Sequence, residues 1–287
     1  MAVSSNMRTF KNAAWLGWEM EANWTDPFLF ATYSVVKPLA GTLILVFMYL
    51  VITHGKTDTM FFSFMYVGNA LYMFVADVLF GVTWVIHDDR EHYMTLKQVY
   101  IAPIKFQTYI FGRAAIKIAI TSFGVLLTLL FGVLLLGVDI NLAAVNWPLF
   151  IVALGLGLAT LAIMGLALGG VTFLTAKHAM GINEGIAGVF YVLSGVIFPI
   201  TILPVWAQSV SKFLPVTYWM EGVRRGLEPG VMSQLGPVTG LQSFSDLQLL
   251  LTLVLTTVAF LFISLGIFRY ADKVARKKGK IDWTSAY

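Results

Sequence analysis

The chain contains no cysteine and unusually few charged residues. Without cysteine it has no disulfide, no thiolate metal site, no thiol nucleophile and no palmitoylation site. Only 12% of its 287 residues are charged, whereas soluble domains carry about 25% because their surfaces face water. Hydrophobic residues make up 58% and the mean hydropathy is +0.80. Most of the surface is therefore expected to face an apolar medium, which indicates an integral membrane protein.

A secretory signal peptide is also missing from the pattern. Residues 1–24 include Arg8, Lys11, Glu19 and Glu21, and no early apolar stretch precedes a cleavage site of small residues. We therefore expect the first membrane span itself to act as the targeting signal.

Long apolar runs dominate what is present. One crossing needs about 20 residues, and lipid forces each run to satisfy its backbone as a helix. Pro38 should mark the first turn of the first run or a kink in it. The sequence predicts an all-α integral membrane fold with six transmembrane helices in one domain, residues 34–270. The six runs are Val35–Thr53, Phe61–Ile86, Phe106–Leu136, Trp147–Thr175, Gly185–Ile202 and Leu247–Tyr270.

Lysine and arginine are unevenly distributed between the connecting segments. With the N-terminus in the cytosol, 15 of the 19 fall on the inner side and four, Lys56, Lys212, Arg224 and Arg225, on the outer side. Cytosolic loops of membrane proteins carry this excess of positive charge. The bias predicts a multi-pass plasma membrane protein with both termini cytosolic, including a basic tail at residues 271–287.

The segment before the first span has a helical apolar pattern. Met7, Phe10, Ala14 and Trp18 recur at steps of three and four residues, and charged residues occupy the rest of the helix. This pattern is typical of an amphipathic helix that lies in the membrane interface. An ordinary span would carry fewer charges, so residues 1–33 are predicted to form an interfacial helix in contact with lipid.

The segment after the second run, His87–Pro103, is the densest charge cluster before the tail. Leu96, Val99 and Tyr100 have helical spacing, and Pro103 would end the helix. A short amphipathic helix on the cytosolic side would offer a docking surface for a soluble partner. A solvated turn explains the same charges.

Residues 199–228 cannot form one straight span, because they contain three prolines. A pair of short helices that enter the outer leaflet and return is the simplest structure, since a broken helix is tolerated where protein buries it. Glu221 has the spacing for an ion pair with Arg224 or Arg225; a surface helix with incidental charges is the alternative. The prolines and aromatic residues are Pro199, Pro204, Trp206, Phe213, Pro215, Tyr218 and Trp219.

Two charged residues lie inside apolar runs. Asp77 is in the second run and Lys117 is in the third. A charge at membrane depth is costly and indicates a functional position. We consider a buried Asp77–Lys117 pair that sets helix register, a proton or substrate site, and an Asp77 that lines a water-filled cavity.

Two pairs of glycines have a spacing that permits close helix contact. They are Gly165 with Gly169 and Gly181 with Gly185. In a chain with 25 glycines this signal is weak.

Two of these segments together resemble the ABC-2 type permeases. The first is Asp89-Arg90-Glu91 followed by Leu96 and Pro103, although Tyr93-Met94 stands where the family more often has a glycine turn. The second has Gly195-x-x-Phe198-Pro199, Pro204 followed by a tryptophan, Pro215 with Thr217-Tyr218, and Glu221 three residues before Arg224. The resemblance extends over nearly the whole chain.

The resemblance implies a permease subunit of an ATP-driven exporter in a prokaryotic plasma membrane. Its cargo would be a hydrophobic drug, a lipid or a lipid-linked glycan; a polysaccharide or O-antigen exporter is the alternative. The resemblance places the ATPase contact at Asp89, Arg90, Glu91, Leu96 and Pro103, with Glu91 the foremost candidate. The helix-breaking prolines, the aromatic residues and the spacing of Glu221 and Arg224 in residues 199–228 predict an outer gate, at Pro199, Pro204, Trp206, Pro215, Tyr218, Glu221 and Arg224.

The exporter interpretation requires a separate ATPase. Gly55-Lys56-Thr57 resembles part of a phosphate-binding loop, but Leu50 stands where that motif needs glycine. ATP and magnesium would then be bound by two cytosolic ATPase subunits, and no cofactor is expected in this chain. A second permease copy, in a homodimer or a pair with a similar chain, would complete the cargo path; nucleic acid is not an expected partner.

Two rival functions follow from the same residues. His87, Asp88, Asp89, Glu91 and His92 could bind a divalent metal in a membrane enzyme. Such enzymes need a second aspartate-rich motif, which the chain lacks. A channel or ion-coupled transporter would need more intramembrane charge than Asp77 and Lys117.

Overall fold

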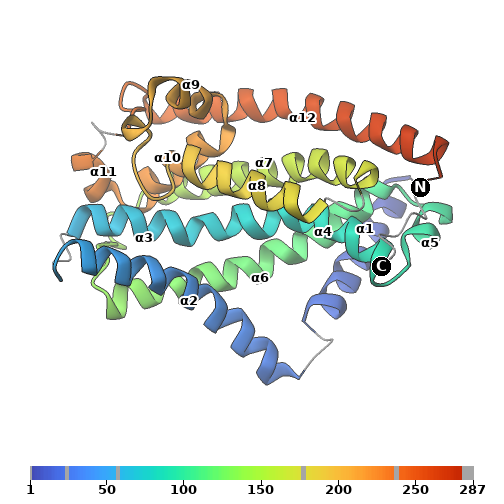
Figure 1. Cartoon of the computed structure of the whole chain (residues 1–287), viewed down its shortest axis with the longest axis horizontal. Coiled ribbons are helices and arrows are strands. Elements are labelled where there is room, and N and C mark those ends of the chain that lie inside the picture. The colour runs from blue at the N-terminus through green and yellow to red at the C-terminus, as the bar shows by residue number, and fades with distance from the viewer. Residues whose placement is uncertain (1, 23–25, 56–58, 176–178, 236–238, 280–287) are drawn as a thin grey trace.

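Helices make up all the regular structure that the computed structural model describes, which covers residues 2–22, 26–55, 59–175, 179–235 and 239–279 (Figure 1). In chain order they are α1 (Ala2–Glu21), α2 (Pro27–Ile52), α3 (Thr59–Phe74), the π-helical turn η1 (Val75–Leu79), α4 (Phe80–Glu91), α5 (Leu96–Ile101), α6 (Phe106–Leu135), α7 (Trp147–Leu174), α8 (Ala179–Leu193), the 3₁₀ turn η3 (Ile200–Ile202), α9 (Val205–Phe213), α10 (Pro215–Leu227), α11 (Pro229–Leu235) and α12 (Asp246–Lys277). The expectation of an all-α chain is confirmed for these residues.

In the described part of the chain, five helices are long and apolar enough to cross a membrane. They are α2, the continuous α3–η1–α4 rod, α6, α7 and α12. These correspond to the first, second, third, fourth and sixth predicted runs. The predicted boundaries at residues 33 and 270 fall inside α2 and α12, because both helices continue beyond their apolar stretches.

The fifth predicted run, Gly185–Ile202, is not one helix. Helix α8 has 15 residues and ends at Leu193. The chain then turns, with Gly195 at a φ of 69° that side chains disfavour, and Pro199 precedes η3. The described residues therefore contain five long candidate spans and one shorter apolar helix, and the predicted six-span layout is not confirmed.

Local capping explains where two of the long helices begin. The Asp26 carboxylate accepts a hydrogen bond of 2.8 Å from the backbone of Phe28, and Pro27 occupies the first position of α2. Ser245 and Gln248 form a reciprocal capping box at the start of α12. Both sites satisfy backbone N–H groups that a helix start otherwise leaves unpaired.

Helix α7 lies at the centre of the bundle, with α12, α10 and α4 packed around it. Gly165 permits its contact with the rod, because an added Cβ would lie 2.6 Å from the Leu79 carbonyl oxygen. At Gly169 an added Cβ would lie 2.8 Å from the end of the Ile86 side chain. The predicted close contact at this glycine pair is confirmed.

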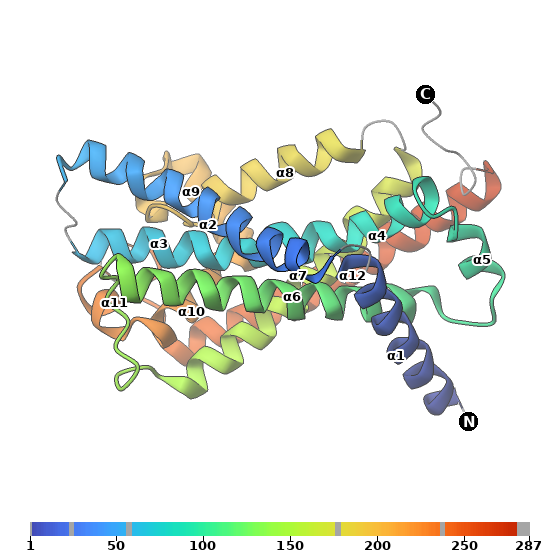
Figure 2. The same cartoon turned by 90° about the horizontal axis from the view of Figure 1, so that it is seen from below.

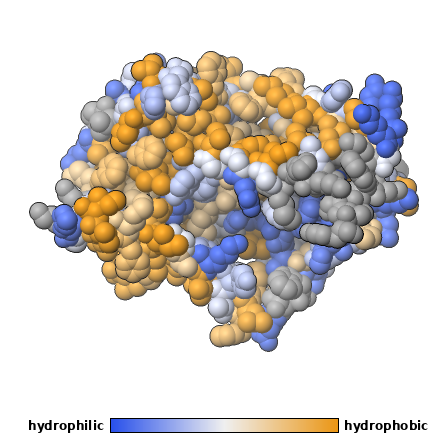
Figure 3. Space-filling model, viewed as in Figure 1, coloured by the Kyte–Doolittle hydropathy of each residue, from blue (hydrophilic) through white to orange (hydrophobic). Residues whose placement is uncertain are grey.

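The two ends of the bundle are formed by different helices (Figures 1 and 2). Helix α5 and the last turns of α12 lie at one end, and α9 and α11 lie at the other. We call these the α5 end and the α11 end. Hydrophobic side chains cover much of the face in Figure 3, and a hydrophilic group marks the end of α12.

Helix α1 packs against α6 near the α5 end. The contact is close at Gly112, where an added Cβ would lie 2.6 Å from the Phe10 carbonyl oxygen. Met7 and Trp15 are each 66% exposed on α1. The predicted N-terminal helix thus exists and presents large apolar side chains outward.

Candidate functional site

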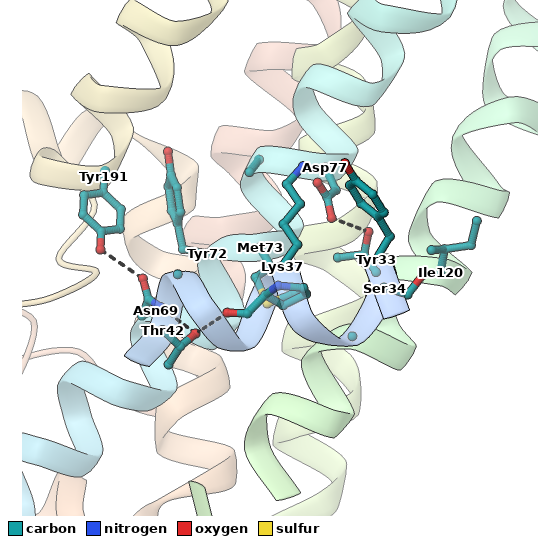
Figure 4. Close-up of a pocket in the computed structure, with 15 residues that line it drawn as sticks. Tyr33, Ser34, Lys37, Thr42, Asn69, Tyr72, Met73, Asp77, Ile120 and Tyr191 are labelled. Atoms are coloured by element: carbon teal, nitrogen blue, oxygen red, sulfur yellow. Dashed lines mark hydrogen bonds between the residues drawn. The ribbon is translucent and has the colours of Figure 1, made fainter. Parts of the chain in front are cut away.

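Two adjoining cavities enter the bundle beside Asp77. One, of about 470 Å³, lies among α2, the α3–η1 segment, α6 and α8 (Figure 4). The other, of about 440 Å³, lies toward the α5 end and is lined by Glu21, Asp88 and Arg113, among others. Lys37, Ala76 and Asp77 line both cavities. We call the pair the Asp77 cavity.

Asp77 lies in the π-helical turn η1 and is exposed. Its carboxylate accepts a 3.0 Å hydrogen bond from the Thr121 hydroxyl of α6. A π turn inserts an extra residue into a helix and is frequently found at functional sites. Here it occurs where an ionisable group faces a cavity within a candidate span.

A chain of hydrogen bonds holds the opposite wall of the cavity (Figure 4). The Tyr191 hydroxyl of α8 donates to the Asn69 side-chain oxygen at 3.0 Å, and the Asn69 amide donates to the Thr42 hydroxyl of α2 at 3.1 Å. Nearby, the Tyr72 hydroxyl donates to the Ala187 carbonyl of α8 at 2.6 Å. These bonds fix α2 and α8 on either side of α3.

Pro38 leaves a backbone carbonyl of α2 without its helical hydrogen bond at this wall. It lies inside α2 rather than in its first turn. Proline has no N–H, so the Ser34 carbonyl lacks the usual helical donor four residues later. Ser34 and Pro38 both line the cavity.

The predicted direct pair between Asp77 and Lys117 is wrong. The Lys117 ammonium instead forms an ion pair with Glu21 of α1. Both side chains of this pair are 25% exposed. Asp77 is left with a hydroxyl partner and an open face, which favours the alternative in which it lines a cavity.

The α5 end places two predicted contact residues inside the protein. Asp89 is fully buried and accepts hydrogen bonds from the Tyr109 hydroxyl at 2.8 Å and from Arg113 at 3.1 Å. Arg90 is 3% exposed and donates to the Thr172 carbonyl of α7 at 3.0 Å. Both side chains therefore hold α4 against its neighbours, and neither faces a soluble partner in this structure.

Glu91 also belongs to α4, which extends through the predicted loop. Its carboxylate accepts from Arg90 at 3.0 Å, and its side chain is 15% exposed. The sequence pattern missed this continuation because four consecutive charged residues usually indicate a solvated turn. Here α4 packs against α6 and α7 and buries two of them.

The predicted short helix after α4 is present as α5. Leu96 is buried, and the Tyr100 hydroxyl donates to Asp272 of α12 at 2.8 Å. The opposite side presents Lys97, Gln98 and Ile101 outward, and Ile101 is 80% exposed. Pro103 follows and is exposed. This outward face of α5 is therefore accessible at the end of the bundle.

At the α11 end the three prolines break the chain as predicted. Pro204 and Pro215 stand at the starts of α9 and α10, where a missing N–H has no cost, and Pro199 precedes η3. Trp206 is 70% exposed on α9. Tyr218 is buried on α10, and its hydroxyl donates to the Lys212 carbonyl at 2.8 Å.

Glu221 pairs with Arg225, not with Arg224. The Arg225–Glu221 distance is 3.0 Å, and the Thr239 hydroxyl donates to the same carboxylate oxygen at 3.1 Å. Arg225 also contacts Asp246 at 3.2 Å. Arg224 points into the protein and donates to backbone carbonyls. Sequence spacing allowed both partners, and the direction of each side chain from α10 decided between them.

Glu228, which the sequence patterns did not single out, ends α10 as a buried carboxyl group. It is 2% exposed, and neither of its carboxyl oxygens has a hydrogen-bond partner among the described residues. Burial raises the pKa of Glu228 to about 8, while Arg224 lowers it and Asp139 raises it further. Glu228 lies outside the candidate spans.

This raised pKa predicts a loss of stability as pH rises from about 4.5 to about 8. Between pH 4.5, the ordinary pKa, and about 8 the folded chain holds a proton that the unfolded chain releases. The free energy of unfolding should therefore fall as pH rises through this window, by on the order of 5 kcal/mol. Thermal unfolding in detergent at several pH values measures it. Glu228→Gln should flatten the dependence and Glu184→Gln, at an exposed site, should not; equal slopes in all three proteins would contradict the assignment.

The described residues contain no group of three or more His, Asp or Glu side chains arranged to hold a metal ion. Within the His87–His92 segment, Asp89 is engaged by Tyr109 and Arg113. The metal-enzyme interpretation therefore lacks a ligand set in this part of the chain.

Comparison with known proteins gives one family. The model of the family described as ABC-2 type transporter matches residues 13–227. This region includes the Asp77 cavity, α5 and the Glu221–Arg225 pair. A search of curated proteins finds no match.

Proposed function

The chain belongs to the ABC-2 type transporter family, and we propose that it is the permease subunit of an ATP-driven exporter of hydrophobic or amphiphilic molecules. Family membership identifies a membrane component of a transporter that works with an ATPase. Direction and cargo are our inference. The observation that supports this inference is the Asp77 cavity, which combines an apolar bundle with an accessible carboxylate at membrane depth.

The cavity suits an amphiphilic cargo better than an ion. The part of the cavity beside α8 is lined by Tyr72 and Met73, among others, and the part toward the α5 end is lined mainly by charged side chains such as Glu21 and Lys37. An apolar region next to a charged one fits a molecule with one apolar and one polar end. We infer that a drug, a lipid or the lipid end of a glycan carrier enters from the α5 end.

We place the α5 end in the cytosol of a prokaryotic cell. The basic residues in the last turns of α12 are at this end, and an excess of positive charge is typical of cytosolic segments. Helix α8 with the turn after it would complete a sixth crossing, and α9 and α10 would lie in the outer leaflet. Helix α1 would lie along the inner interface, with Trp15 in the headgroup region.

A second copy of the permease would cover the open side of the cavity. Tyr33 is 72% exposed beside Lys37 and Asp77, which are exposed as well. Charged groups facing lipid at this depth would be costly. We therefore propose a dimer of permease chains, homodimeric or formed with a similar chain, that binds two ATPase subunits.

We propose the outward face of α5 as the ATPase contact. Ile101→Asp should abolish co-purification of the ATPase activity with the tagged permease, because it places a charge on the exposed apolar centre of this face. Leu142→Asp is the matched control, since Leu142 is 67% exposed and belongs to the segment between α6 and α7, which lies at the opposite end of the bundle (Figure 2). The measurement is the ATP hydrolysis activity that remains with the tagged permease after affinity purification from the native membrane. If the Ile101 variant keeps its ATPase and its coupling, α5 is not the contact.

Asp77 should be needed for transport and not for assembly. Asp77→Asn removes the charge and keeps the shape, so we expect an export rate lower by about tenfold, equal to the loss of one favourable charge interaction. ATP-driven uptake of a fluorescent phospholipid or lipophilic dye into inverted vesicles, whose cytosolic face points outward, measures the rate, with co-purification of the ATPase as the assembly readout. Asp139→Asn, at an exposed site outside the cavity, should leave export unchanged. Normal export by the Asp77 variant would remove this residue from the cargo path.

The Glu221–Arg225 pair is our revised proposal for the outer gate. Its side chains are nearly buried, at 5% exposed for Glu221 and 15% for Arg225. Separating such a pair costs several kcal/mol, so we propose that the movement driven by the ATPase supplies this energy and shifts the short helices α9 and α10. Trp206 on the adjoining helix would face the outer interface.

A further inference from the structure

A second cavity lies between α7, α8 and α12 and shares no lining residue with the Asp77 cavity. Its volume is about 510 Å³, within the usual size of small-molecule sites. Among the described residues, every lining side chain is apolar except that of Ser264 on α12. Met164 of α7 and Phe190 of α8 form part of its walls. We call it the Ser264 cavity.

The glycine pair of α8 lines this cavity and contacts no helix. Gly181 and Gly185 were predicted to permit a close helix contact, as Gly165 and Gly169 do. A Cβ added at either α8 glycine would have no neighbouring atom within 4 Å. The small residues therefore leave an apolar space where the pattern predicts a neighbouring helix.

Ser264 supplies an unused polar group at the cavity wall. It is fully buried, and its hydroxyl has no hydrogen-bond partner among the described residues. A serine inside a helix usually donates to the carbonyl four residues earlier, as Ser122 does to Ile118. An unpaired hydroxyl in apolar surroundings is costly, so a ligand oxygen at this position would be stabilised.

The depth of Ser264 in the membrane indicates which chemical group the ligand oxygen belongs to. Arg269, the first charged residue toward the α5 end of α12, follows five residues later, or about 7.5 Å along the helix. Charged residues near the ends of spans reach the lipid headgroups. Ser264 therefore lies just below headgroup level, where glycerolipids carry their ester groups.

The mouth of the cavity faces the membrane. Val189 of α8 is 52% exposed, and Ile263 and Ile267 of α12 are 51% and 38% exposed. All three line the cavity, and the surface around α8 and α12 is largely hydrophobic (Figure 3). A lipid chain can thus enter sideways from the bilayer without crossing a polar surface.

We infer that the Ser264 cavity is a binding site for one ester-linked membrane lipid. The acyl chain lies along Gly181 and Gly185 between α7 and α12, and an ester carbonyl accepts a hydrogen bond from Ser264. Under the orientation proposed above, this lipid comes from the inner leaflet. The site is separate from the cargo path and does not depend on the transport proposal.

Photolabelling tests the site directly. The purified chain in nanodiscs is illuminated with a phosphatidylcholine that carries a diazirine in the middle of one acyl chain, and adducts are mapped by peptide mass spectrometry. We expect adducts at Met164, Phe190 or Ile263. Gly185→Leu fills the cavity and should abolish them, with Gly185→Ala giving a partial loss if the leucine variant does not fold.

Gly188→Leu is the matched control. Gly188 also has open space around it, on the same helix, but does not line the cavity. This variant should keep the cavity adducts. Leu255 and Phe262, each 70% exposed on α12, report general lipid contact and should be labelled equally in all variants. Labelling of these outward residues only, or equal cavity labelling in the Gly185 and Gly188 variants, would overturn the proposal.

Ser264→Ala tests the hydrogen bond to the lipid. Cavity labelling should fall by roughly fivefold, the effect of one neutral hydrogen bond. Ser122→Ala, at an exposed position, should leave it unchanged. Undiminished labelling of the Ser264 variant would overturn the assignment of an ester-linked ligand.

Discussion

Replacing Arg224 by alanine is expected to lower the melting temperature by about 10 °C, a loss of about 4 kcal/mol or more. The guanidinium donates to the Gly195 carbonyl at 2.7 Å, the Val196 carbonyl at 2.5 Å and the Phe64 carbonyl at 3.1 Å. Arg224 is 2% exposed, and its charge lies 3.6 Å from the centre of the Phe64 ring. It thereby joins α10, the turn after α8 and α3.

Two further variants separate this role from a general effect of removing arginine. Arg276→Ala should lower the free energy of unfolding by no more than about 1 kcal/mol. The Arg276 side chain is 58% exposed and pairs with Asp272. Gly68→Ala should mimic the loss at Arg224, because an added Cβ would lie 1.8 Å from the guanidinium. Scanning fluorimetry in detergent measures all three. Similar melting temperatures for the Arg224 and Arg276 variants would show that Arg224 does not join these helices.

Asp89→Ala is expected to destabilise the chain by about 3–5 kcal/mol, because it leaves Arg113 buried without a charged partner. The side chains of Asp89 and Arg113 are 0% and 2% exposed. The Tyr109 hydroxyl also loses its acceptor. Thermal unfolding of the purified protein measures the effect.

A double substitution provides the internal control. Asp89→Leu with Arg113→Met removes both charges and should recover most of the lost stability, since apolar replacement of a buried pair is often neutral or better. If Asp89→Ala alone is as stable as the original chain, the pair has no structural role. If the double variant is no more stable than Asp89→Ala, the lost stability comes from side-chain packing at this site and not from the unpaired charge.

The candidate site was only partly visible in the sequence. Asp77 was found because a charge inside an apolar run is rare. Asn69 and Met73 precede Asp77 by eight and four residues, and this four-residue spacing on one helix face is a sequence signal for the polar wall of the cavity. Tyr191 and Thr42 could not be assigned, because they reach Asn69 from helices distant in the sequence.

The predicted contact residues show the same limit. Asp89, Arg90 and Glu91 have the composition of a surface loop, and nothing local indicates that α6 and α7 cover two of them. Leu96 and Pro103 were placed correctly at a short helix because their spacing is a local property. The exposed face of α5, centred on Ile101, appears only once the buried side of that helix is known.

By itself the sequence determined the membrane class, the long helices and the breaks at Pro199, Pro204 and Pro215. These depend on local properties: apolar length, backbone hydrogen bonding within one helix, and the missing N–H of proline. Only the tertiary structure decided which charges pair, and it brought Lys117 to Glu21 across 96 residues. It also decided that one glycine pair meets a helix and the other meets a cavity. A spacing pattern gives the face of a helix, whereas packing of distant segments decides what that face contacts.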